Sequence, residues 1–143
     1  MSYQLLEDIA TADSAYEAKG KNPSELFSSA ATALEEVQVD TKKIESREKR
    51  VVKLESGTLE NLLFDFLNEL VFLKDAEGLV FGEFDLKIKT LSPNRHSLTA
   101  KLGGEKLDPK RHELRTDVKA VTKHMFGIKQ ENGTYKAIVV LDV

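Results

Sequence analysis

The chain ends on two negative charges that directly follow an apolar run. Residues 137–141 read Ala-Ile-Val-Val-Leu, a composition typical of a buried strand. Asp142 comes next, and Val143 adds the terminal carboxylate. Two unit charges about 5 Å apart repel by roughly 1 kcal/mol in water and by roughly 3 kcal/mol at an effective dielectric constant of about 20. The pattern leaves two interpretations, a polar tail that frays into solvent or a carboxylate pair that binds a cation.

A third carboxylate stands near the start of the chain. Asp13 lies among the small residues of the segment 11–15, where a strand is predicted to begin. Oxygen ligands suit Ca²⁺, Mg²⁺ and Mn²⁺ better than they suit zinc. Asp13, Asp142 and the Val143 carboxylate are thus candidate ligands for a hard divalent cation, provided that the two ends of the chain meet. Residues so far apart in sequence need not meet, so the polar-tail interpretation stays open.

The three histidines give little support for catalysis. No G-x-S-x-G segment or other local nucleophile signature accompanies them. His124 falls on the apolar face of a predicted strand, which indicates a buried, hydrogen-bonded imidazole more readily than a ligand. His112 follows Asp108-Pro109 in a polar loop, where it either bonds locally or faces a partner. We therefore do not expect an independent enzyme.

The amino-acid composition limits the kinds of molecule that this protein is expected to bind. The 143 residues include 21 basic and 24 acidic side chains, a net charge of −3, which gives no general attraction to a nucleic-acid backbone. The basic segments TKKIESREKR and DPKRHELR are diluted by acids and carry no aromatic residues for base stacking. No strong direct nucleic-acid binding is expected.

Other classes of site are also disfavoured. The chain has no cysteine, so disulfides and thiolate metal sites are excluded. The pairs Gly103-Gly104 and Gly78…Gly82 do not match a phosphate-binding loop and are interpreted as turn glycines. No secretion signal or membrane span is predicted, and a cytoplasmic protein is expected.

Two helices are predicted. Asn22-Pro23-Ser24-Glu25 marks a helix start, because Asn is a favourable N-cap, Pro suits the first helical position and Glu completes a capping box. Apolar residues at three-to-four spacing continue this helix to Val37. A second helix with a wide apolar face is expected from Thr58 to Leu73, with Gly78 past its end.

Strands account for most of the remainder. Residues 131–133, Glu-Asn-Gly, form a hairpin turn that pairs the last two strands, and the charged segment 44–54 is expected at a sheet edge. The fold class predicted is α+β, a single domain over residues 1–143 with a largely antiparallel β-sheet and two α-helices on one side of it. The expected strands cover residues 3–6, 13–19, 44–54, 79–90, 98–102 (stopped by the glycine pair), 118–128 and 136–143.

The order of several short motifs resembles the archease family over essentially the full length of the chain. Each motif is weak alone, but their order, spacing and shared endpoint make the match specific. The motifs are Thr11-Ala12-Asp13 with Gly20 seven positions later, SELFSSAATAL, LLFDFLNELVFLKDAEGLVFGEF, Gly104-Glu105, Asp108-Pro109 with His112, DVKAVTKH, and the ending Leu141-Asp142-Val143.

This resemblance implies a function. Archeases are protein cofactors of the RtcB-type RNA ligase, which uses GTP and Mn²⁺ in tRNA splicing and RNA repair; they promote guanylylation and multiple turnover without being ligases themselves. The family's metal site maps onto Asp13, Asp142 and Val143, with calcium as the expected ion and magnesium or manganese as alternatives. The family commonly carries a histidine where this chain has Ala10. The alternative that the resemblance offers is a chaperone-like modulator of a tRNA methyltransferase.

Overall fold

The computed structural model describes residues 2–6 and 14–143. These ranges contain eight strands, two α-helices and one short 3₁₀ helix. In chain order the elements are β1 (Ser2–Leu6), β2 (Ser14–Gly20), α1 (Pro23–Gln38), η1 (Thr41–Lys43), β3 (Glu48–Ser56), α2 (Leu59–Glu77), β4 (Leu79–Ser92), β5 (Arg95–Lys106), β6 (Ala120–Val121), β7 (Gly127–Glu131) and β8 (Thr134–Asp142).

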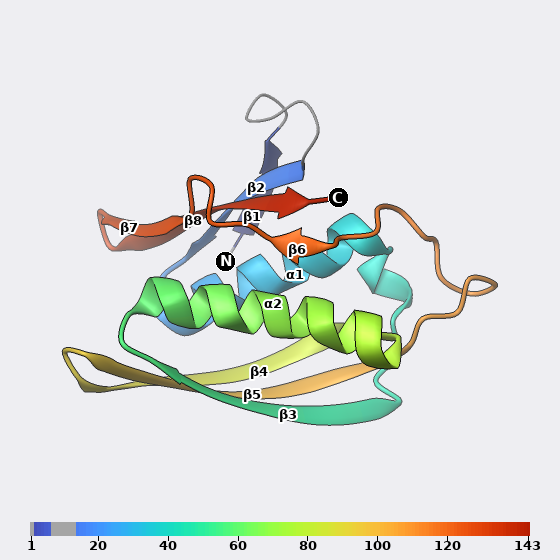
Figure 1. Ribbon diagram of the computed structural model, residues 1–143, viewed down its shortest axis with the longest axis horizontal. Coiled ribbons are helices and arrows are strands. Elements are labelled where there is room, and N and C mark those ends of the chain that lie inside the picture. The colour runs from blue at the N-terminus through green and yellow to red at the C-terminus, as the bar shows by residue number, and fades with distance from the viewer. Residues whose placement is uncertain (1, 7–13) are drawn as a thin grey trace.

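The two helices lie between two antiparallel sheets (Figure 1). One sheet has five strands in the order β1-β2-β8-β6, with β7 also paired to β8, and the other has three strands in the order β3-β5-β4. Helix α1 contacts β2 and β8 of the first sheet and β4 of the second, and α2 likewise contacts strands of both. The α+β class and the two helices are as predicted. The arrangement differs, because the helices separate two sheets instead of covering one side of a single sheet.

Helix α1 begins as its sequence predicts. Asn22 Oδ1 accepts a hydrogen bond from the Glu25 amide at 2.9 Å, and Glu25 Oε1 accepts one from the Lys21 amide at 3.1 Å. Pro23 occupies the first helical turn, where no intrahelical donor is required. The buried face of this helix meets both sheets and includes Leu26, Phe27, Ala30, Ala31, Ala33 and Leu34.

Helix α2 is longer than predicted and ends at Glu77. Thr58 caps its first turn by accepting from the Asn61 amide at 3.1 Å. Gly78 terminates it in the left-handed conformation, with φ of 68°, and donates to the Lys74 carbonyl at 2.8 Å. This conformation favours glycine over residues with a Cβ. The inward face of α2 is fully buried and includes Leu62, Leu63, Phe66, Leu67 and Leu70.

The three-stranded sheet corrects the interpretation of two glycine pairs. Strand β5 does not stop at Gly103-Gly104 but continues to Lys106, and Gly82 lies inside β4 at a register shift between Phe81 and Glu83. Gly104 is needed for close packing, because a Cβ there would lie 2.0 Å from the Val80 carbonyl oxygen. The edge position predicted for the charged segment is confirmed by β3.

The segment predicted as one strand over residues 118–128 is broken into two. Only Ala120–Val121 forms β6, and β7 starts at Gly127. Between them the chain turns at Met125, whose φ is 55°, and the Thr122 amide and hydroxyl both bond the Val140 carbonyl. A left-handed residue cannot continue a strand, so the alternating pattern overestimated its length.

Candidate functional site

The acidic chain end is held by backbone on both sides. Leu141 is buried and pairs with Ser14 of β2 on one side and with Val121 of β6 on the other. The Asp142 carbonyl accepts from the Lys119 amide at 2.8 Å. The Asp142 side chain is exposed, whereas that of Val143 packs against the apolar core. Pairing this close to the terminus restricts the carboxylates to one region of the surface, which argues against a frayed tail.

The predicted ligand Asp13 lies outside the described residues. Ser14, which follows it, is described and pairs directly with Leu141, which precedes Asp142. The structure therefore brings the start of β2 beside the end of β8, at one end of the five-stranded sheet (Figure 1).

Two side chains of α2 hold the strand that flanks the acidic end. Asn68 Oδ1 accepts from the Val121 amide at 3.0 Å. The buried Lys74 ammonium donates to the Val118 carbonyl and to Asp117 Oδ1, each at 2.6 Å. These bonds fix residues 117–121 against α2 and thereby fix the Lys119 amide that contacts Asp142. Sequence reasoning did not single out either residue, although Lys74 is the one basic residue of a helix with five acids.

The donors available at this end suit a hard cation. Asp142 and the terminal carboxylate offer only oxygen atoms, the ligand type that calcium and magnesium prefer. Within residues 2–6 and 14–143, no three His, Asp or Glu side chains cluster closely enough to hold a metal ion. Asp142 and Val143 are adjacent in sequence at the end of β8, and a cation bound by them would need further oxygen donors to complete its coordination shell.

His124 is not on the apolar face of a strand, as the alternating pattern predicted. It is exposed in the turn between β6 and β7, and its amide donates to Thr122 Oγ1 at 3.3 Å. The interruption of the predicted strand removes the alternation on which that placement depended.

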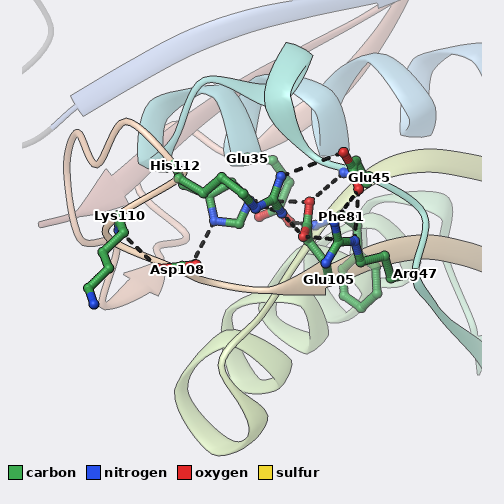
Figure 2. A network of polar contacts seen from close by, with 9 residues as sticks. Glu35, Glu45, Arg47, Phe81, Glu105, Asp108, Lys110 and His112 are labelled. Carbon is green, nitrogen blue, oxygen red and sulfur yellow. Dashed lines mark hydrogen bonds and ion pairs between the residues drawn. The ribbon is translucent and has the colours of Figure 1, made fainter.

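His112 belongs to a buried polar network (Figure 2). Its Nδ1 accepts from the Asp108 amide at 2.8 Å, and its Nε2 lies 3.2 Å from Glu105 Oε2. Glu105 is also buried and accepts from the Glu45 amide at 2.5 Å and from the Arg111 guanidinium. The network joins the segment before β3 to the loop after β5.

The contacts of His112 fix its tautomer. Because Nδ1 accepts from a backbone N–H, the proton of the neutral ring is on Nε2, which faces Glu105 Oε2 at 3.2 Å. Burial, reinforced by the nearby Arg111 charge, lowers the pKa of His112 and keeps the ring neutral at pH 7. Both ring nitrogens are occupied inside the chain, so the geometry assigns this histidine to bracing the loop 107–119.

Glu35 is the most strongly perturbed carboxyl group described. It is fully buried in α1, where Oε2 accepts from the Phe81 amide at 2.5 Å and Oε1 from Gln38 Nε2 at 2.9 Å. Burial raises the pKa of Glu35 to about 8, against the opposing effects of these two hydrogen bonds and the Lys74 charge. The sequence of α1 does not predict that Glu35 is buried, because a glutamate at this position could equally face solvent.

Comparison with known proteins decides the family. The Archease protein family matches residues 3–143 of this chain. The chain belongs to the archease family. An archease of Pyrococcus abyssi is 42% identical over 134 residues, covering 93% of this chain and 94% of that protein. An archease of Methanothermobacter thermautotrophicus is 41% identical over 133 residues, with the same two shares covered.

Solved structures agree with the archease fold. The solution structure of protein 1598 of Methanobacterium thermoautotrophicum has a TM-score of 0.86 at 38% identity, covering 99% of this chain and 98% of that one. A crystal structure of a Thermotoga maritima archease, described as a possible chaperone, has a TM-score of 0.62 at 24% identity, covering 94% and 93%. Among the described residues of our archease chain, no helix is long and apolar enough to cross a membrane.

Proposed function

We propose that this archease is a non-catalytic, metal-binding activator of an RtcB-type RNA ligase in tRNA splicing and RNA repair. The observation that carries the proposal is the pairing of Ser14 with Leu141. Consecutive Cα atoms are about 3.8 Å apart, so Asp13 and Asp142 each stand one residue from a directly paired position. The proposal is that Asp13, the residue before Ser14, and Asp142, the residue after Leu141, supply acidic oxygens to one cation at this end of the five-stranded sheet.

The cation proposed at this end is calcium, held by Asp13, Asp142 and the Val143 carboxylate, with magnesium or manganese as alternatives. A bound cation supplies the positive charge that offsets repulsion among these carboxylates. The pairing of β8 with β2 and β6 holds the strand that ends at Asp142 on both sides, which suits a charged surface that docks beside the ligase active site. There the acidic end promotes guanylylation and repeated turnover of the ligase.

The proposal is tested by multiple-turnover RNA ligation with the cognate ligase. Asp142→Asn keeps the side-chain shape and removes one carboxylate, so stimulation should fall at least tenfold, a loss of about 1.4 kcal/mol. Asp65→Asn is the matched control, because Asp65 is an exposed acid of α2 away from β8. Both variants should unfold at the wild-type temperature, since the replaced side chains are exposed.

Equal stimulation by Asp142→Asn and wild type would contradict the proposal. Calcium calorimetry gives a second readout on the protein without ligase. A glycine added after Val143 moves the terminal carboxylate, and the affinity for calcium should fall; unchanged binding would exclude that carboxylate from the site.

The alternative is a chaperone-like modulator of a tRNA-modifying enzyme such as a tRNA methyltransferase. The Thermotoga maritima relative is described as a possible chaperone. A chaperone surface requires contiguous exposed apolar area. The large exposed apolar side chains described here come from several different elements: Tyr3, Leu5, Val51, Phe72, Leu91, Leu114 and Met125. Suppression of client aggregation that persists in excess chelator would favour this alternative over the metal-dependent one.

A further inference from the structure

The outer face of the three-stranded sheet carries four lysines, which we call the lysine face: Lys53, Lys87, Lys89 and Lys101. Lys53 and Lys87 flank Thr99 in one cross-strand row. Lys89 lies in the next row opposite Ser97, and Lys101 lies in the row on the other side, opposite Asp85. All four side chains are exposed, and the opposite face of the sheet packs on α2.

Two of the acidic residues on the outer face of this sheet pair with basic residues outside the lysine face. Glu83 pairs with Lys49 at 3.6 Å, and Glu55 pairs with Arg95 at 2.8 Å. Within the described part of the chain, none of the four lysines has an acidic group within ion-pair distance. Asp85 is the remaining acid on this face, so the positive charge there is largely uncompensated.

Charge is distributed unevenly over the molecule. The outer face of this sheet holds six basic and three acidic side chains, a net charge of +3, whereas the whole chain carries −3. The acidic end of β8 belongs to the other sheet, and both helices lie between the two sheets (Figure 1). An overall negative charge therefore does not prevent one side of the protein from attracting an anion.

The spacing of these lysines suits an extended polyanion. Strand geometry places the Cα atoms of Lys53 and Lys87 about 10 Å apart, and those of Lys87 and Lys89 about 7 Å apart. The outer face is open and contains no aromatic side chain for base stacking; the large exposed apolar residues of these strands are Val51 and, at the hairpin end of β4, Leu91. These features favour contacts with phosphates over contacts with bases or insertion into a lipid surface.

We propose that the lysine face binds the phosphate backbone of single-stranded RNA, without preference for base sequence. The charge pattern indicates a nucleic-acid strand, and the choice of RNA rests on the proposed function in RNA ligation. The surface would let the protein contact the RNA while its acidic end faces the enzyme. Binding is weak and salt-sensitive, because it depends on the charges of only four lysines. The net negative charge of the whole chain gives no indication of this local positive surface.

Fluorescence anisotropy with a labelled oligouridine of about 12 nucleotides tests the proposal on the full chain without ligase. Four phosphate contacts predict a slope of log affinity against log salt of about −3, from about 0.7 per contact. Lys53→Glu combined with Lys87→Glu should weaken binding at least tenfold at low salt and reduce the slope to about −1. The control, Lys110→Glu with Lys129→Glu, makes the same change in net charge at exposed residues elsewhere and should bind within twofold of wild type.

The proposal is overturned by absence of RNA binding at low salt, by equal losses in both double variants, or by binding to anionic vesicles in place of RNA. Oligodeoxythymidine bound much more tightly than oligouridine would overturn the choice of RNA. The outcome is separable from the proposed function. Asp142→Asn should bind RNA like wild type, so loss of ligase stimulation in that variant says nothing about the lysine face, and loss of RNA binding in the lysine variant says nothing about the metal site.

Discussion

Glu35 should make the stability of this protein fall as the pH rises above neutrality. Its carboxyl group has no exposed surface, and burial raises its pKa from 4.5 to about 8. Between these two values the folded state keeps a proton that the unfolded state has released. The folded state therefore binds more protons, and the free energy of unfolding decreases with pH until Glu35 itself ionises.

The size of this effect follows from the pKa of Glu35 in the unfolded and folded states. A tenfold change in a proton-binding constant corresponds to about 1.4 kcal/mol, so the full window from 4.5 to about 8 amounts to about 5 kcal/mol. The lowered pKa of His112 acts in the opposite direction near and below pH 6.5. Between about pH 7.0 and 8.5 the titration of His112 contributes little. Over this range the ionisation of Glu35 should lower the free energy of unfolding by about 1 kcal/mol.

Urea denaturation at several pH values in this range measures the slope. Glu35→Gln replaces the ionisable group with an amide of similar shape, so its unfolding free energy should lose this pH dependence whatever its absolute stability. Glu60→Gln, at an exposed position of α2, should keep the wild-type slope. A wild-type stability that stays constant or rises over the range, or a slope that survives in Glu35→Gln, would refute the assignment of a neutral buried carboxyl.

Two further variants test close packing in the three-stranded sheet and the anchoring of the segment beside the acidic end. Gly104→Ala should destabilise the protein by about 1–3 kcal/mol or more, because the added Cβ would lie 2.0 Å from the Val80 carbonyl. Gly127→Ala, where a Cβ meets nothing within 4 Å, should stay within about 0.5 kcal/mol in the same thermal unfolding assay. Lys74→Met should leave the Val118 carbonyl unbonded, cost about 1–3 kcal/mol, and speed hydrogen exchange at the Lys119 amide; Lys42→Met, at an exposed site, should do neither. Slow exchange at Lys119 in Lys74→Met would show that α2 does not anchor this segment.

Local signals accounted for much of the fold. The N-cap Asn22, the start of the second helix near Thr58 and the hairpin at residues 131–133 depend on neighbours within a few positions, and the structure confirms each of them. Features set by distant neighbours were predicted less well. Gly104 looks like a turn residue in sequence, yet it is required by the approach of β4, which sequence spacing does not reveal.

The candidate site shows the same division. The position of Asp142 at the end of a strand followed from its local pattern, whereas the anchoring of that end by Lys74 and Asn68 depends on how α2 packs on β6. His124 was misplaced because alternation continued through a turn at Met125. Asp13 lies outside the described residues, and its role stays a prediction.

The position of β8 in its sheet also governs when this region can form during biosynthesis. Strand β8 pairs with β2, which is made early, and Leu141 and Ser14 are 127 positions apart in sequence. Contacts between such distant segments form late, because the chain entropy lost on closing so long a loop precedes any gain from pairing. Until β8 has been synthesised, β2 and β6 have no strand between them. The acidic end is therefore assembled late in folding, and translation products that stop before β8 would lack it.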